Sequence, residues 1–141
     1  VPQMEPHNTV EQVQRMVEYV KKRAAGKVQF HFIHEHDAMV APLSPPLFDW
    51  VIENLLKNAL DAMDGNGSIT VTLKEEAGKV LIDVTDTGKG IASQNINRVF
   101  KPGFTTKKRG WGLGLSLSKR IIEQYHKGKL FVKHSEVGKG T

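Results

Sequence analysis

The amino-acid sequence predicts an α+β fold, a two-layer α/β sandwich in which about three helices cover one face of a mixed, mostly antiparallel sheet. Three segments carry the apolar period of a helix, and runs of alternating apolar and polar residues between them are typical of strands. The chain has 141 residues, of which 39% are apolar and 25% are charged, so it suits one domain with one hydrophobic core.

The chain should open with a short irregular segment and a helix. Residues 1–8 contain two prolines and no apolar period, so we expect a linker tail there. The first helix should begin at Thr9, which can cap it together with Gln12, and it should end before Gly26. The domain itself should therefore span residues 9–141.

Two strands should follow the first helix. Val28, Phe30 and Phe32 alternate with polar residues, and residues 38–41 can form a second, short strand. Three histidines occur on or just after the first strand without a companion cluster of ligands, so we interpret them as exposed strand-end residues and not as a metal site. They are His31, His34 and His36.

The longest predicted helix carries a stripe of polar residues. Ser44 can cap this helix, Pro45 and Pro46 fit its first turn, and its apolar period continues to Met63. Three polar residues at spacing i, i+4 and i+7 share the edge of the apolar face, and burying them is costly unless something binds them. Amides that are satisfied within the protein are the alternative explanation. The stripe consists of Asn54, Asn58 and Asp61.

A hairpin should follow the long helix, after a turn rich in Asp, Asn and Gly. Residues 69–73 and 80–84 alternate in polarity and are joined by a short link, which is typical of two antiparallel strands. Asp86 continues the parity of the inward residues, so its carboxylate should face the helices. Gly88 and Gly90 then offer bare backbone, which suits an adenine whose exocyclic amine needs an acceptor. A β-turn in which the carboxylate caps backbone amides is the alternative.

A glycine-rich loop should come next. Residues 95–100 can form a helical turn, and residues 101–112 should form a long loop. Its alternating glycines lead into a helix, so backbone amides can face a polyanion beside three basic residues. The spacing is neither that of a Walker A loop nor that of a Rossmann fingerprint, and a flexible surface loop is the alternative. The residues concerned are Lys107, Lys108, Arg109, Gly110, Gly112 and Gly114.

The chain should end with a helix, a strand and a turn. The helix covers residues 113–125, and its inner face should consist of Leu113, Leu117, Ile121 and Ile122. Residues 129–134 should form a last strand, and residues 138–141 a turn.

Charge and composition argue against several classes of function. The formal net charge is +5 and the pI is about 9.5, but the basic residues are scattered, which is not the pattern of a nucleic-acid binder. The chain has 0 cysteines, so it has no disulfide and no thiol nucleophile, which fits a reducing compartment. No apolar run reaches the roughly 18 residues of a membrane span, and we expect no direct membrane insertion of this piece.

Several segments together resemble the motifs of one family of ATP-binding domains. Residues 54–59 are similar to its N box, 86–90 to its G1 box, 100–107 to its F box, 110–115 to its G2 box and 138–141 to the start of its last glycine motif. This is the Bergerat fold shared by gyrase, Hsp90, MutL and histidine kinases. The chain looks most similar to the catalytic domain of bacterial sensor histidine kinases, over about residues 9–141.

The resemblance implies a site for ATP and Mg²⁺. Asn58 would be the Mg²⁺ ligand, Asn54 would lie beside it as the second catalytic residue, and Asp86 would bond adenine. About residues 93–112 would form the lid over ATP. The ATP-binding residues implied by the family motifs are Asn54, Asn58, Asp61, Asp86, Gly88, Gly90, Ile91, Phe100, Thr105, Thr106, Lys107, Lys108, Arg109, Gly110, Gly112, Leu113, Gly114, Leu115 and Thr141.

The chain departs from the family pattern at three positions. Many members carry Lys where this chain has Asp61, so we expect the phosphate-facing cation to come from residues 107–109. Gyrase-type ATPases place a Glu base where this chain has Asn54, as histidine kinases do, and this argues against autonomous ATP hydrolysis. Gly103 replaces a commonly bulky residue of the F box, which should loosen the lid.

The implied activity is that of a protein histidine kinase, which transfers the γ-phosphate of Mg-ATP to a histidine on a separate dimerisation domain in two-component signalling. The two nearest acceptor motifs are His7-Asn8 in the expected tail and His34-Glu35 at a strand end, and we reject both. We therefore expect the dimerisation and phosphoacceptor helices to precede Val1, and this piece to be inactive in autophosphorylation without them.

The expected partners are those helices and the receiver domain of a response regulator. The expected location is the cytoplasm, which includes the cytoplasmic part of a membrane-anchored sensor. Two alternatives stay open, namely a nucleotide-binding switch or pseudokinase without transfer activity and a protein serine kinase of the anti-sigma type.

Overall fold

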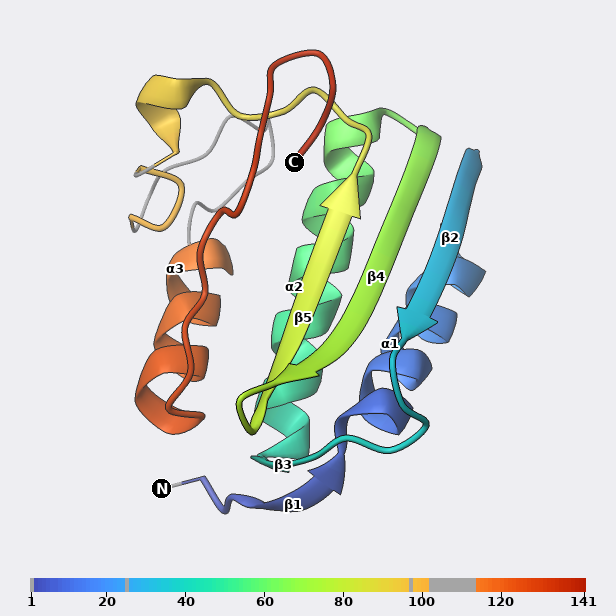
Figure 1. The fold of residues 1–141 in the computed structure, drawn as a ribbon. Helices are drawn as coiled ribbons and strands as arrows, with labels where there is room; N and C mark the ends of the chain where they lie inside the picture. The colour runs from blue at the N-terminus through green and yellow to red at the C-terminus, as the bar shows by residue number, and fades with distance from the viewer. Residues whose placement is uncertain (1, 25, 97, 102–113) are drawn as a thin grey trace.

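The computed structural model describes residues 2–24, 26–96, 98–101 and 114–141, and it shows a two-layer α+β sandwich, which confirms the predicted fold class (Figure 1). The elements are β1 (Glu5–Asn8), α1 (Thr9–Arg23), β2 (Lys27–His34), β3 (Val40–Leu43), α2 (Pro45–Met63), β4 (Asn66–Glu76), β5 (Lys79–Asp86), the 3₁₀ turn η1 (Ser93–Asn95), α3 (Gly114–Arg120) and the π-helical turn η2 (Ile121–Tyr125). Helices α1 and α2 lie on one face of the sheet, and α3 lies beside α2. Within the described residues, no helix is long and apolar enough to cross a membrane.

The main sheet has the strand order β2-β4-β5. Strand β2 runs parallel to β4, and β5 runs antiparallel to β4 in a hairpin that places Ile69 opposite Asp86. The hairpin turns at Ala77 and Gly78, which both have positive φ angles. The predicted hairpin is therefore confirmed, and its register brings Asp86 to the end of the sheet that lies beside the C-terminal end of α2 (Figure 1).

Strands β1 and β3 form a separate antiparallel ribbon that pairs Glu5 with Leu43 and Asn8 with Val40. The prediction of an irregular tail is thus wrong for Glu5–Asn8, because β3 supplies backbone partners that the local pattern did not reveal. The predicted cap of the first helix is wrong by one residue. Asn8 is the N-cap, and its side-chain oxygen accepts the Val10 N–H at 3.1 Å, while the buried Thr9 hydroxyl donates to the Met39 carbonyl.

The core lies between the helices and the inner face of the sheet. Most of its buried members come from one stripe on α1, one stripe on α2 and the alternate residues of β4, as the apolar periods predict. They include Val13, Val17, Ile52, Leu56, Ala59, Ile69, Val71 and Leu73. The sheet therefore fixes the face of α2 that carries Leu56, and the polar stripe of α2 lies at the edge of this contact.

Truncation of Leu56 should destabilise the domain strongly. The Leu56 side chain has 0% exposed surface, so the Leu56→Ala variant leaves a cavity between α2 and β4, and we expect a loss of about 2–5 kcal/mol in the free energy of unfolding. Urea unfolding measures this loss. The matched control is Leu81→Ala, at a side chain that is 39% exposed and should lose far less. Equal losses for the two variants would contradict this account of the core.

The C-terminal region differs from the prediction in two respects. The predicted helix is present as α3 and η2, and of its predicted inner face Ile121 is buried and Ile122 half-buried, as expected. Leu117 is 38% exposed, however, and Ser118 is 0% exposed in its place, while Leu113 lies outside the described residues. The predicted strand over residues 129–134 is wrong. This segment has no backbone ladder and is joined to β5 by the Lys133 ammonium, which lies 3.0 Å from the Asp83 carboxylate.

The N-terminus of α2 is linked to the end of η2. Ser44 occupies the cap position as predicted, but its side chain makes no capping hydrogen bond. Its backbone N–H instead donates to His126 Nε2 at 3.2 Å, and His126 Nδ1 bonds the Ile121 carbonyl at 3.1 Å. This contact attaches the C-terminal end of the α3 and η2 segment to the start of α2.

Candidate functional site

The first part of the site is the end of β5. Asp86 is partly buried, as its strand parity predicts, and its Oδ1 accepts hydrogen bonds from the backbone N–H groups of Gly88 at 2.8 Å and Thr141 at 3.2 Å. The Asp86 N–H donates to the Thr141 carbonyl at 2.7 Å. The carboxylate thus makes the backbone contacts of the capping alternative, and it holds both the turn after β5 and the last residue of the chain.

The two glycines after Asp86 are required by close packing. A Cβ on the buried Gly88 would lie 2.5 Å from the Ala62 carbonyl oxygen, which already accepts the Lys89 N–H at 2.9 Å. Gly90 has a φ of +76°, and a Cβ there would overlap the Glu136 carbonyl. The turn after β5 is consequently pressed against the C-terminal end of α2 on one side and against the last turn of the chain on the other.

Ser135 is a member of this site that the sequence did not reveal. Its hydroxyl oxygen accepts the Ile91 N–H at 2.7 Å and lies 2.8 Å from the Thr141 hydroxyl. Ser135 thus joins the segment that follows the turn after β5 to Thr141. No periodic pattern marks this serine, and its only signal is its position just before the glycine-rich end of the chain.

The second part of the site is the polar stripe of α2. Asn54 Nδ2 donates to the buried Ser118 hydroxyl of α3 at 3.0 Å. Asn58 is partly buried one turn farther along α2, and Asp61 is exposed near its C-terminal end. The stripe predicted from the i, i+4, i+7 spacing therefore lies at the margin of the core, between α3 and the turn that follows β5.

The structure places the described residues of the predicted set in two groups. The first, around Asp86, contains Gly88, Gly90, Ile91 and Thr141, and the second, around Asn54 and Asn58, contains Gly114 at the start of α3. Leu115 is partly buried in α3, and the partly buried Phe100 has its ring 4.9 Å from the Lys119 ammonium. Outside the described residues lie Thr105, Thr106, Lys107, Lys108, Arg109, Gly110, Gly112 and Leu113.

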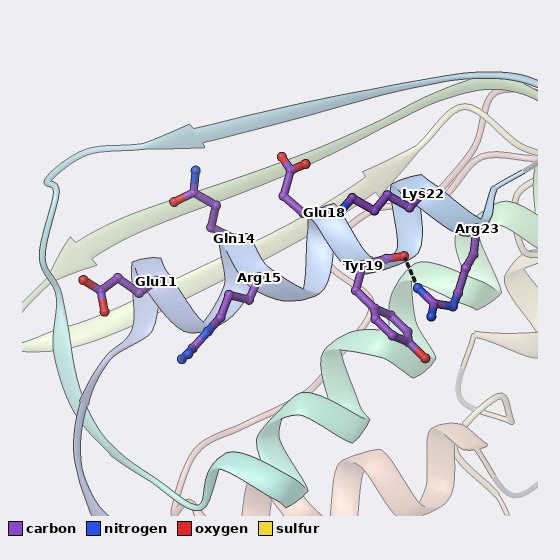
Figure 2. Close-up of a pocket in the computed structure, with 7 residues that line it drawn as sticks. All are labelled: Glu11, Gln14, Arg15, Glu18, Tyr19, Lys22 and Arg23. Carbon is purple, nitrogen blue, oxygen red and sulfur yellow. Dashed lines mark hydrogen bonds between the residues drawn. The ribbon is translucent and has the colours of Figure 1, made fainter.

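A surface hollow elsewhere on the molecule is not this site. It has a volume of about 600 Å³ and runs along the outer face of α1, where its residues point to solvent (Figure 2). Arg23 donates to the Tyr19 carbonyl at 3.3 Å and lies over the Tyr19 ring at 3.8 Å. The lining of the hollow mixes acidic and basic side chains, which is typical of a solvated helix face. The hollow contains none of the residues around Asp86 or Asn54.

The side-chain oxygens on the polar stripe of α2 are of the kind that a magnesium nucleotide needs. Mg²⁺ prefers oxygen ligands and takes most of them from water and phosphate, so one amide oxygen such as that of Asn58 suffices as a protein ligand. Asn54 and Asp61, on the same stripe, can hold metal-bound waters. Within the described residues, no group of three or more His, Asp or Glu side chains is placed to hold a metal.

The α+β sandwich, the carboxylate at the end of β5 and the asparagine stripe on the facing helix agree with the resemblance of the sequence to ATP-binding domains. Residues 44–141 match the family described as "Histidine kinase-, DNA gyrase B-, and HSP90-like ATPase". The chain belongs to this family. Within it, the chain is similar to the catalytic domains of sensor histidine kinases.

Three proteins are similar to this chain, two of them in sequence and one in structure. The chain is 39% identical over 115 residues to the sensor histidine kinase ZraS of Escherichia coli, which covers 82% of this chain and 24% of that protein. It is 46% identical over 92 residues to sporulation kinase E of Bacillus subtilis, covering 64% and 12% of the two chains. The nucleotide-free catalytic domain of the histidine kinase ThkA superposes with a TM-score of 0.83 at 29% identity, over 94% of this chain and 88% of that one. The chain thus spans about a quarter of the length of ZraS.

Proposed function

We propose that this domain binds Mg-ATP and donates the γ-phosphate to a histidine on a separate dimerisation domain. The observation that carries the proposal is Asn54, which stands at the position where hydrolytic members of the family use a glutamate base, and which bonds Ser118 within the protein. An amide cannot remove a proton from water, so this site positions ATP without activating water. Phosphoryl transfer to a separate acceptor then needs positioning and charge neutralisation more than covalent help.

Each part of the site has a separate task in this proposal. Asp86 accepts the exocyclic amine of adenine while its backbone contacts hold the base pocket in shape. Asn58 holds Mg²⁺, with Asn54 beside it, and the residues of the proposed lid, which lie largely outside the described part of the chain, would cover the phosphates. Bound Mg²⁺ would neutralise charge on the phosphates during transfer.

Phosphotransfer to a supplied acceptor tests the function. We expect the chain, mixed with ATP labelled at its γ-phosphate and with a dimerisation domain that carries the acceptor histidine, to label that domain at an acid-labile phosphohistidine. Acid-stable label on serine would favour a protein serine kinase. Measurable Mg-ATP affinity without any label transfer would favour a nucleotide-binding switch.

Substitution of Asp86 tests the adenine assignment. We expect Asp86→Asn to weaken the affinity for ATP by about tenfold, because the amide has one acceptor atom and its NH₂ group opposes the amine of adenine. A titration with a fluorescent ATP analogue measures this change, and GTP competition shows whether the base preference is lost as well. The control is Asp83→Asn, which should bind ATP normally. Asp83 lies on the same strand as Asp86, and its carboxylate pairs with Lys133. Unchanged ATP affinity in Asp86→Asn would contradict the assignment.

The partners and the location follow from the same proposal. ThkA, a relative of the chain, was crystallised in complex with the response regulator protein TrrA, and its chain in that complex superposes with a TM-score of 0.78 at 26% identity. We therefore propose that a response regulator receives the phosphate from the histidine that this domain phosphorylates. The domain would work in the cytoplasm, where ATP is supplied, together with dimerisation helices of its own protein.

A further inference from the structure

Ser118 is a fully buried polar residue on a short helix. Its exposed fraction is 0%, although its neighbour Leu117, which the apolar pattern places inside, is 38% exposed. A buried hydroxyl is costly unless it is hydrogen-bonded, so a leucine outside and a serine inside is not the arrangement that packing alone favours. The position of Ser118 needs a polar reason.

The polar partner of Ser118 is the side chain of Asn54. The Asn54 Nδ2 atom donates to Ser118 Oγ at 3.0 Å, across a separation of 64 residues in the sequence. Because the NH₂ end of the amide is used in this way, the orientation of its other end, the acceptor Oδ1, is fixed as well.

Gly114 holds the same amide from a second direction. It lies one helical turn before Ser118, on the same face of α3, and a Cβ on Gly114 would be 2.6 Å from Asn54 Oδ1 and 3.0 Å from Nδ2. The glycine therefore lets the helix backbone lie directly against the amide group, and the serine supplies the hydrogen bond. Together they leave the Asn54 side chain little freedom to rotate.

We propose that Ser118 is a positioning residue, which sets the orientation of the Asn54 amide so that Oδ1 is available to the metal-bound waters beside Asn58. The inference rests on the proposed function of the α2 stripe and adds to it a residue outside the family motifs quoted above. It also gives α3 a specific task. The hydrogen bond between Ser118 and Asn54 joins α3 to the polar stripe of α2.

Three substitutions of Ser118 distinguish the effect of its hydroxyl group from the effect of its side-chain volume. Ser118→Ala removes the acceptor of Asn54 Nδ2. Ser118→Thr and Ser118→Val have nearly the same shape, so they share the cost of the added methyl group, and only Thr keeps the hydroxyl. All variants are made in the full chain.

The first measurement uses the nucleotide-free protein. In the wild type and in Ser118→Thr, NMR should show one Asn54 side-chain amide that exchanges slowly with solvent, because its proton is bonded and buried. In Ser118→Ala and Ser118→Val we expect exchange to be about tenfold faster. Equal exchange in the Thr and Val variants would overturn the inference.

The second measurement is the gain in affinity for a fluorescent ATP analogue when EDTA is replaced by Mg²⁺. We expect this gain to fall about tenfold in Ser118→Ala and Ser118→Val and to be kept in Ser118→Thr. In an Asn54→Ala background, Ser118→Ala should cause no further loss, because the residue acts through Asn54. A serine with a merely structural role would lower thermal stability and leave the Mg²⁺-dependent gain unchanged, and that result would overturn the inference.

The two measurements distinguish failure of this inference from failure of the proposed function. If the wild type shows no gain from Mg²⁺, the proposed function fails, and the amide exchange still decides whether Ser118 orients Asn54. If the wild type shows the gain and the Ser118 variants keep it, the inference alone fails. If the methyl group of Ser118→Thr is not accommodated, the double substitution with Asn54→Ala decides without that variant.

Discussion

Replacement of Asn58 with alanine is expected to remove the Mg²⁺-dependent part of the affinity for ATP and to lower phosphotransfer on the order of 100-fold. Asn58 lies on the stripe of α2 at the margin of the core, one turn beyond the Asn54 that Ser118 holds, and its amide oxygen is the type of ligand that Mg²⁺ takes. Titration of a fluorescent ATP analogue with Mg²⁺ and with EDTA measures the first effect. Label transfer to an added dimerisation domain measures the second.

The matched control for Asn58→Ala is Glu53→Gln on the same helix. Glu53 pairs with Lys57 at 3.2 Å on the solvent side, where the lysine side chain is 61% exposed, and an ion pair of this kind contributes little. We expect Glu53→Gln to keep both the Mg²⁺-dependent affinity and phosphotransfer. A large loss in Glu53→Gln together with normal behaviour of Asn58→Ala would mean that another residue holds the metal.

Replacement of Gly140 with alanine should weaken ATP binding through Asp86, although Gly140 is not among the predicted ATP-binding residues. Gly140 has a φ of +121°, and a Cβ there would overlap the Asp86 carbonyl oxygen and lie 2.9 Å from Thr87 Cα. The last turn of the chain must then move away from the end of β5. We expect a loss of about 1–3 kcal/mol in the free energy of unfolding from backbone strain, and a loss of affinity for ATP of about tenfold or more, because the Thr141 N–H no longer holds Asp86.

Gly138→Ala is the control for Gly140→Ala in the same turn. Gly138 also has a positive φ, of +84°, but a Cβ there would meet nothing within 4 Å. It should therefore carry a backbone cost of about 1 kcal/mol in urea unfolding and keep its affinity for ATP. Equal losses of ATP affinity in the two variants would show that strain in the turn, and not its contact with Asp86, shapes the base pocket.

The parts of the fold that the sequence predicts well are those set by local period. The apolar stripe of α2, its proline start and its end at Met63 follow from nearest-neighbour geometry, as does the β4–β5 hairpin. The inward parity of Asp86 could be predicted for the same reason, because the hairpin fixes which face each residue occupies.

The parts that failed depend on contacts between distant segments. Glu5–Asn8 becomes a strand because β3 lies beside it, whereas residues 129–134 find no backbone ladder and contact β5 through the side chain of Lys133. Ser118 and Ser135 belong to the site through hydrogen bonds to residues 64 and 44 positions away, and no local pattern records such partners. The position of Ser118 one turn after Gly114, on the same helix face, places it near the glycine motif but does not indicate its partner.

The ribbon of β1 and β3 ties together the starts of the two long helices. Strand β1 leads directly into α1, and β3 leads into α2 through the single residue Ser44. The ribbon pairs the two strands from Glu5–Leu43 to Asn8–Val40, so one antiparallel ladder holds the N-terminal ends of both helices (Figure 1). The helix that carries the asparagine stripe is therefore anchored at its start to the first strand of the domain.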